Sequence, residues 1–258
     1  MLIEPIGGLC NRIRVILAAI IYCEHAEIDL DINWVNNIKL ANLYNSPNKT
    51  MRVDEVAGGH FTDVFLHNTL SKKIKINFVG EKDHVKESYI ENNLPNFYRG
   101  TNVSIFKNSI SDFKKIYLQM HKRLRLVDEL QNQVDDLAFS TPAYNSIHIR
   151  RTDLSNWLKS RNRNVTALSK FENFIIKKSD EHVFLATDCV ATRNYLVKKY
   201  PTQIFYQGSL SEVDRPSQRP SSLQQAATDI FLCVRSKEFL GTKESSFSDL
   251  IKTLRRVM

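Results

Sequence analysis

The sequence has few cysteines, and they form no recognisable pattern. Its 258 residues include only Cys10, Cys23, Cys189 and Cys233, which are widely separated and form no Cys-x-x-Cys pair. Structural zinc sites usually need Cys-x-x-Cys pairs, and disulfide-stapled domains need many cysteines for their length, so both are disfavoured. Scattered single thiols favour a reducing compartment.

The sequence also lacks a long apolar run and a recognisable targeting segment. Its longest apolar stretch, Val15 to Cys23, is too short to cross a bilayer. Met1 leads directly into Leu-Ile-Glu-Pro-Ile-Gly-Gly, without the basic start and apolar core of a signal peptide. We therefore expect no transmembrane segment and a cytoplasmic location.

Internal repeats, low-complexity tracts and known nucleic-acid-binding modules are absent as well. The composition, 42% hydrophobic and 25% charged, is that of an ordinary globular protein. The net charge of +8 suggests an anionic partner, but the basic residues are spread along the chain and do not cluster with aromatic residues. We expect no nucleic-acid partner, and a salt-dependent affinity for RNA or DNA would contradict that.

What the sequence does contain is an alternation of strand and helix patterns in two halves. The first half is expected to hold strands at Leu2–Pro5, Ile28–Val35, Ile74–Val79 and Val103–Phe106, and helices at about Asn11–Glu24 and within residues 111–137. The second half is expected to hold strands at Ser146–Arg150, His182–Thr187, Gln203–Tyr206 and Glu238–Gly241, and helices near Ala167–Lys178, Ala191–Tyr200, Ser222–Val234 and Phe247–Val257. Such alternation predicts an α/β fold with mostly parallel sheets flanked by helices.

The segment from Ser146 to Asp153 is the most informative. It is an apolar strand that ends in Arg-Arg-Thr-Asp, and ligands of open α/β sheets bind at the carboxyl ends of strands. Arginine offers a fixed fork of donors, which suits a phosphate. Strand alternation places His148 and Arg150 on one face and Arg151 on the other. The alternative is a surface turn whose charges are simply solvated.

Three further segments could contact a ligand or have only a structural role. The turn Gly7-Gly8 before a helix lets the backbone approach a ligand, although it could serve chain reversal alone, with Asn11 as a cap. Arg12 is unfavourable at a helix N-terminus unless something offsets its charge. Asp188 could contact a base or ribose, or cap the next helix.

The last of these segments is rich in hydroxyl groups. Ser245, Ser246 and Phe247 begin the final helix and could cradle a phosphate, although a simple serine cap would look similar. Asp229, on the preceding helix, could equally be a surface charge.

Together these segments resemble the fucosyltransferase superfamily of glycosyltransferases, which includes α1,6-, α1,2- and protein-O-fucosyltransferases. The matching elements are the glycine-rich turn GGLCNR, then HIRRTD, FLATD and ESSFSDLI, in the family's order and over nearly the whole chain. HIRRTD is the most specific of them. Cys10 departs from the family, which often has glycine there, and residues 36–110 match no element of the family.

The resemblance implies a GT-B-like fold of two Rossmann-type domains. We divide the chain into residues 1–140, an N-terminal α/β domain on the acceptor side, and residues 141–258, a nucleotide-sugar-binding domain. Arg150 would bind the β-phosphate of the leaving GDP, and Asp153 is a further catalytic candidate. The other donor-binding residues implied are Gly7, Gly8, Asn11, Arg12, His148, Arg151, Asp188, Asp229, Ser245, Ser246 and Phe247.

The implied activity is transfer of fucose from GDP-fucose to a glycan or another hydroxyl acceptor, with inversion and without a metal or cofactor. Another UDP- or GDP-linked sugar as donor, or a non-catalytic nucleotide- or glycan-binding protein, remains an alternative. Asp29-Leu30-Asp31 resembles a metal-binding Asp-x-Asp pattern, but its alternating context predicts a strand instead. Asp29, Asp31 and Asp153 are the candidates for a base.

Overall fold

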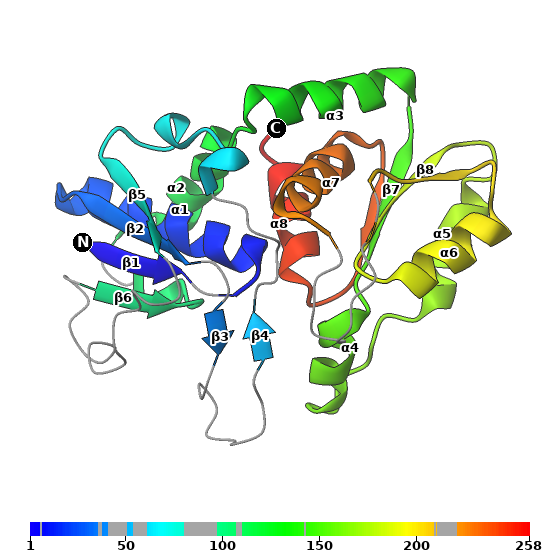
Figure 1. The fold of residues 1–258 in the computed structure, drawn as a ribbon, viewed down its shortest axis with the longest axis horizontal. Helices are drawn as coiled ribbons and strands as arrows, with labels where there is room; N and C mark the ends of the chain where they lie inside the picture. The colour runs from blue at the N-terminus through cyan, green and yellow to red at the C-terminus, as the bar shows by residue number, and fades with distance from the viewer. Residues whose placement is uncertain are drawn as a thin grey trace. The chain divides into compact units, whose positions relative to one another are not determined.

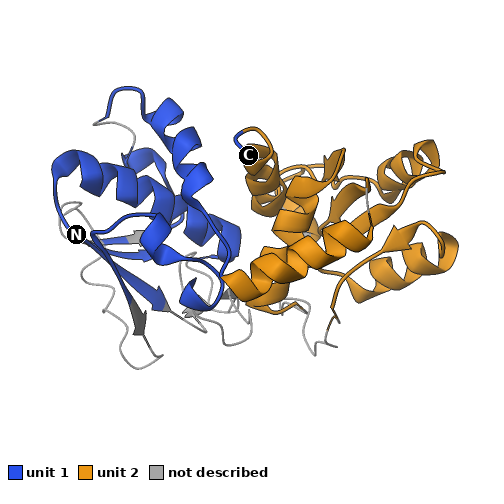
Figure 2. Cartoon of the chain, turned by 90° about the horizontal axis from the view of Figure 1, so that it is seen from above, with its two compact units in different colours: residues 1–127, 257–258 blue, residues 128–256 orange. Residues whose placement is uncertain are grey.

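A computed structural model describes residues 1–5, 7–35, 38–40, 51–53, 61–79, 97–106, 110–141, 143–208, 210 and 221–258. The chain divides into two compact units (Figure 2): unit 1 comprises residues 1–127 with 257–258, and unit 2 comprises residues 128–256. Within the part of the chain that the structure describes, every helix is too short or too polar to span a bilayer.

Unit 1 is built on a four-stranded parallel sheet in the order β5-β2-β1-β6 (Figure 1). Its strands are β1 (Leu2–Pro5), β2 (Leu30–Val35), β5 (Ile74–Val79) and β6 (Phe97–Gly100). Its helices are α1 (Leu9–Ala26) and α2 (Phe113–Met120), with short 3-10 helices η1 (Phe61–Asp63), η2 (His67–Thr69), η5 (Ser104–Phe106) and η6 (His121–Arg123). A separate antiparallel pair is formed by β3 (Ile38–Leu40) and β4 (Met51–Val53).

Helix α1 forms the core of unit 1. It is buried almost all round because it packs against β1 and β2 as well as against α2. The helix begins at Leu9, two residues before the expected start, because Gly8 already takes the extended N-cap conformation. Asn11 therefore lies inside the first turn and is not the cap. Glu27, in the left-handed conformation with φ 55°, ends the helix.

One strand expected in the first half is wrong. Residues 104–106 of the strand expected at Val103–Phe106 form the 3-10 helix η5. The strand that pairs with β1 on this side is β6, which begins six residues before Val103. The reason is local, because the Asn102 side-chain oxygen accepts hydrogen bonds from the Ser104 backbone N–H at 2.9 Å and from the Ser104 hydroxyl at 2.7 Å. This bonding closes a turn and competes with an extended ladder.

Unit 2 contains a second four-stranded parallel sheet, in the order β10-β7-β8-β9. Its strands are β7 (Asn145–Ile149), β8 (Val183–Thr187), β9 (Ile204–Phe205) and β10 (Phe239–Gly241). Its helices are α3 (Asp128–Ser140), α4 (Thr152–Lys159), α5 (Leu168–Lys177), α6 (Val190–Lys199), α7 (Leu223–Arg235) and α8 (Ser246–Leu254). The predicted α/β architecture with parallel sheets is thus present in both units.

Two helices of unit 2 differ from what the sequence suggested. Helix α4 lies between the strand expected to end at Arg150 and the helix expected near Ala167, where the sequence suggested no helix. Its Leu154 and Leu158 are buried one helical turn apart. Helix α3 belongs to unit 2, although the expected division after residue 140 assigned it to the first half. It packs along α7, where Arg235 and Asp135 form an ion pair.

Strand β7 is buried on both faces, and its alternation decides which side chains meet which helices. Ile147 and Ile149 pack in the apolar cluster that β7 and β8 share with α5 and α6. Ser146 and His148 face the opposite side, where they contact residues of α7, α8 and the turn that follows α7. The polar side chain of His148 therefore lies on the face of the sheet that contacts α8.

The strand order of each unit reverses at one position. In unit 2 the chain runs outward through β7, β8 and β9 and then returns to place β10 on the other side of β7. In unit 1 it runs outward from β1 through β2 to β5 and then places β6 on the other side of β1. Ligands of open α/β sheets bind beyond the carboxyl ends of the strands at such switch points.

Candidate functional site

Arg150 directly follows β7, at the switch point of unit 2. Its backbone N–H donates to the Thr242 hydroxyl at 2.9 Å, and that hydroxyl in turn donates to the His148 carbonyl at 2.9 Å. The Thr242 N–H also donates to the His148 carbonyl, at 3.0 Å. Thr242 follows β10 and thus ties the end of β10 to the start of the arginine turn, Arg150–Arg151.

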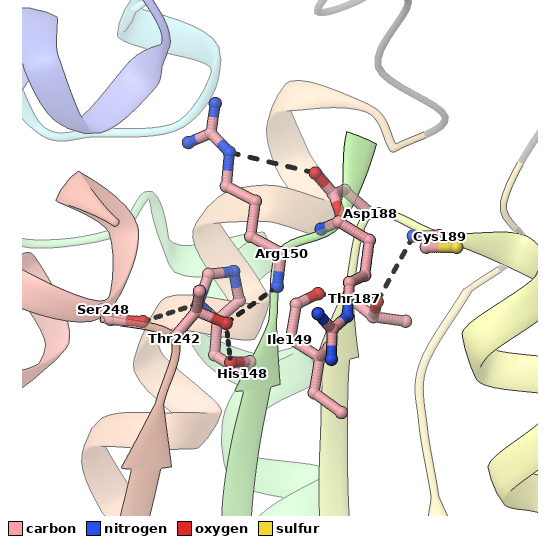
Figure 3. Close-up of polar contacts among 9 residues, drawn as sticks. His148, Ile149, Arg150, Thr187, Asp188, Cys189, Thr242 and Ser248 are labelled. Carbon is pink, nitrogen blue, oxygen red and sulfur yellow. Dashed lines mark hydrogen bonds and ion pairs between the residues drawn. The ribbon is translucent and has the colours of Figure 1, made fainter. Parts of the chain in front are cut away.

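Asp188 holds the other side of the arginine turn. One of its oxygens accepts the Arg151 N–H at 2.8 Å, and the other lies 3.9 Å from Arg150 Nε. Figure 3 shows the Arg150 side chain extending beyond the end of β7, with its Nε facing Asp188. Thr187 supports the same edge, since its hydroxyl donates to the Ile149 carbonyl at 2.7 Å and accepts from Cys189 N at 3.2 Å.

His148 links β7 to the start of α8. Its Nδ1 is hydrogen-bonded to the Ser248 hydroxyl at 2.7 Å, and its ring stacks on Phe247 with centroids 4.4 Å apart. The approach requires a glycine in β10, because a Cβ on Gly241 would lie 2.5 Å from Ser248 Oγ. His148 is buried, so it acts in the packing between strand and helix as well as near the site.

The N-terminus of α8 carries an unusual serine. Ser245 is 1% exposed, and its hydroxyl has no hydrogen-bond partner among the described residues. It occupies the N-cap position without capping the helix through its side chain. The preceding Glu244 takes φ 61° and forms an ion pair with Arg163 at 2.6 Å. A buried hydroxyl beside unpaired helical N–H groups is suited to an anion.

Asp229 is buried within α7 and is not a surface charge. Its carboxyl oxygen Oδ1 accepts a hydrogen bond from Gln207 Nε2 at 2.9 Å, and Gln207 follows β9. Burial raises the pKa of Asp229 to about 8, and the bond from Gln207 only partly opposes this. A carboxyl group kept near its point of titration can accept from, or donate to, the polar edge of a base.

The glycine turn of unit 1, Gly7–Gly8, lies at the switch point of that unit. Gly7 has φ +92°, and a Cβ there would lie 3.1 Å from the Asn11 amide nitrogen and 3.2 Å from the Thr101 methyl group. Arg12 is only 2% exposed; its Nε donates to the Gly7 carbonyl at 2.9 Å and its guanidinium lies 4.6 Å above the Trp34 ring. These contacts offset the charge at the helix start.

The structure thus brings the predicted residues together in two groups, one in each unit. His148, Arg150, Arg151, Asp188, Ser245, Ser246, Phe247 and Asp229 belong to unit 2, and Gly7, Gly8, Asn11 and Arg12 to unit 1. Asp153 lies in the first turn of α4, and its side chain is outside the described residues. Asp29 and Asp31 lie at the amino end of β2, the edge opposite the glycine turn.

Three residues near the site received no individual role from the sequence: Thr242, Ser248 and Gln207. Thr242 and Ser248 lie in the hydroxyl-rich segment around the start of the last helix, whereas Gln207 was not singled out at all. The available signal was a threonine at or just after the end of two apolar strands, Thr187 and Thr242, but nothing local showed that both would flank β7. Among the described residues, no three histidine, cysteine or acidic side chains gather as metal ligands.

Comparison with known proteins identifies the family. The sequence profile of GDP-fucose protein O-fucosyltransferases matches residues 57–258, well over half of the chain. No curated protein matches the chain significantly in sequence. This family match agrees with the predicted fucosyltransferase resemblance, which is thereby confirmed.

Solved structures show the same fold at low sequence identity. POFUT1 in complex with GDP matches with a TM-score of 0.57 at 14% identity, covering 98% of this chain and 93% of POFUT1. NodZ α-1,6-fucosyltransferase soaked with GDP-fucose matches with a TM-score of 0.56 at 13% identity, covering 98% of this chain and 92% of NodZ. NodZ from Bradyrhizobium matches with a TM-score of 0.53 at 13% identity, over 97% and 91% of the two chains.

The family profile includes the segments that carry Arg150, Asp188, Asp229 and Ser245–Phe247, and the structural matches confirm the predicted GT-B-like fold class. The chain is therefore a glycosyltransferase that belongs to the GDP-fucose protein O-fucosyltransferase family.

Proposed function

We propose that the chain transfers fucose from GDP-fucose to a hydroxyl group of a glycan or another acceptor, with inversion and without a metal ion. The observation that carries the proposal is the position of Arg150 at the switch point of unit 2, where β7 adjoins the start of α8. The family match supports the donor, because its members are described as using GDP-fucose.

Each residue of the site has a proposed part in the reaction. As the acceptor oxygen attacks the anomeric carbon, the bond to the diphosphate breaks and negative charge accumulates on GDP. The guanidinium of Arg150 stabilises this charge without reorganising. Ser245 and Ser246 with the α8 N-terminus donate to phosphate oxygens, and Asp229 with Gln207 contacts the base. His148 and Phe247 shape the site beside them.

The proton of the acceptor hydroxyl needs a base, for which we propose Asp153. Asp29 and Asp31 are less suitable because they lie at the amino end of β2. Gly7, Gly8, Asn11 and Arg12 of unit 1 are proposed to contact the donor. A cytoplasmic location also remains a proposal, supported by the four widely separated cysteines of the sequence, which form no Cys-x-x-Cys pair.

Nucleotide binding provides the first test. Thermal unfolding is measured with GDP, UDP, ADP and dTDP, each with and without Mg²⁺, since a ligand at ~100 times its dissociation constant adds ~2.7 kcal/mol to stability. We expect stabilisation by GDP alone that does not depend on Mg²⁺. A preference for UDP would replace the donor, and no response to any nucleotide would contradict the proposal and favour a non-catalytic binding protein.

Variants of Arg150 test the catalytic role directly. We expect Arg150→Ala to lower the rate of GDP release from GDP-fucose on the order of 10²–10³-fold, because a preorganised donor to the leaving group is lost. Arg150→Lys should restore only part of the rate, since it keeps the charge but not the fork. Near-normal turnover by a folded Arg150→Ala protein would contradict the assignment.

A further inference from the structure

The backbone N–H of Arg150 is hydrogen-bonded to a side chain, where in a continuing sheet it would be bonded to the backbone of the neighbouring strand. Strand β10 ends at Gly241, so no β10 residue remains to accept the Arg150 N–H. The Thr242 hydroxyl accepts it instead, at 2.9 Å, while donating to the His148 carbonyl. Thr242 is 1% exposed, so water does not readily replace this bond.

The opposite side of the arginine turn is held in the same manner by β8 and the residue after it. Both oxygens of Asp188 face the turn, one bonded to the Arg151 N–H and the other opposite Arg150 Nε. Figure 3 shows Thr242 and Asp188 on the two sides of Arg150. The Arg150 and Asp188 side chains are 13% and 10% exposed, so their attraction is only weakly screened by solvent.

This arrangement bears on how the donor is bound. An arginine fork stabilises a diphosphate only when its direction is set in advance, because ordering it on binding would cost free energy. Contacts at the backbone N–H and at Nε together orient the side chain from both ends. The base was the other partner considered for Asp188, but both carboxylate oxygens face the arginine turn.

We propose that Thr242 and Asp188 are positioning residues that orient Arg150 toward the donor diphosphate, and that Asp188 does not read the nucleotide base. The inference rests on the proposed function, since it requires GDP to bind at Arg150.

The experiment is calorimetric titration of the full chain with GDP, GMP and ADP. Thr242→Val removes the hydroxyl at nearly constant volume, and Thr242→Ser keeps it. Ser146→Ala is the matched control. It also removes a buried hydroxyl group, but one that lies on β7 at the end away from Arg150. Asp188→Asn removes the charge but leaves an oxygen for the Arg151 N–H. Thermal melting of every variant confirms that it is folded.

We expect Thr242→Val to weaken GDP binding roughly 3- to 10-fold, the worth of one hydrogen bond, and to leave GMP binding unchanged because GMP lacks the β-phosphate. Thr242→Ser and Ser146→Ala should bind both nucleotides as the wild type does. Asp188→Asn should keep the wild-type preference for GDP over ADP.

Two results would overturn the inference while leaving the proposed function intact. One is an unchanged ratio of GDP affinity to GMP affinity in Thr242→Val, whether neither nucleotide or both bind more weakly. The other is a lost guanine preference in Asp188→Asn. A wild-type protein that binds no GDP would instead overturn the proposed function, and the inference with it.

Discussion

At the scale of single residues, burial gives Asp229 a property that its sequence neighbours do not reveal. The carboxyl group lies inside α7, and desolvation raises its pKa to about 8. Cys233, one turn further along the helix, is also buried, and this burial raises the pKa of its thiol. The negative charge that Asp229 carries when ionised adds to that rise. Both groups are therefore mainly uncharged near neutral pH.

The raised pKa of Asp229 predicts a pH-dependent stability. In the unfolded chain the group titrates near its ordinary value of 3.8, so between about pH 4 and pH 8 the folded protein holds a proton that the unfolded chain has released. The free energy of unfolding should therefore fall as pH rises through this range. Asp229→Asn should remove that contribution and be the more stable protein near pH 8.

Urea unfolding of both proteins between about pH 5 and pH 8 measures the difference. Asp136→Asn, which changes an exposed carboxyl group on α3, is the control and should follow the wild type. If Asp229→Asn and the wild type keep a constant difference in stability over this range, the raised pKa is wrong.

At the scale of elements, the contact between β10 and α8 sets the geometry of the site. Gly241 lets Ser248 approach, and Ser248 binds His148 on the neighbouring strand. The start of α8, with the buried Ser245 hydroxyl, is thereby held close to the end of β7. The packing of β7, β10 and α8 thus depends on the absence of a side chain at Gly241.

Substitution of Gly241 tests this dependence. In Gly241→Ala the new Cβ would meet Ser248 Oγ at 2.5 Å and Ser248 Cβ at 2.6 Å, so α8 must shift. We expect a loss of about 1–3 kcal/mol in the free energy of unfolding, as for other overpacked sites. Weaker GDP binding should accompany it. Thr253→Ala, further along α8, is the control, and equal stabilities of the two variants would contradict this role of Gly241.

At the scale of the whole molecule, the chain consists of two α/β units that each have a switch point and a group of predicted site residues. The boundary lies at Val127–Asp128, and α3 packs with unit 2 through Leu130 and Val134. The expected boundary after residue 140 separates this helix from α7.

The position of the boundary predicts how fragments behave. Residues 128–256 should fold alone and bind GDP, because the unit has its own core and the proposed diphosphate-binding residues. Residues 141–258 should be less stable, since each of the buried Leu130 and Val134 side chains contributes about 1.5–3 kcal/mol. Urea unfolding followed by circular dichroism compares them, and equal midpoints would show that α3 adds nothing to unit 2.

The sequence by itself determined the elements whose signal is local. Short, mainly apolar segments predicted β1 and β5 with their observed ends and β8 to within one residue. Strand β8 is buried at every position, and a strand covered on both faces reads as a continuous apolar run. The residue types in HIRRTD and ESSFS indicated phosphate binding. An arginine with its fork of donors and a hydroxyl-rich helix start can both be recognised within a short segment.

Only the tertiary structure decided how those segments meet. Thr242 and Arg150 are 92 residues apart in the chain, and His148 and Ser248 are 100 apart, yet strand order makes them neighbours. Parallel pairing is set by crossover connections and by burial of whole faces, which no short segment encodes. The sequence therefore supplied the chemical groups, and the strand order determined that Arg150 stands between Thr242 and Asp188.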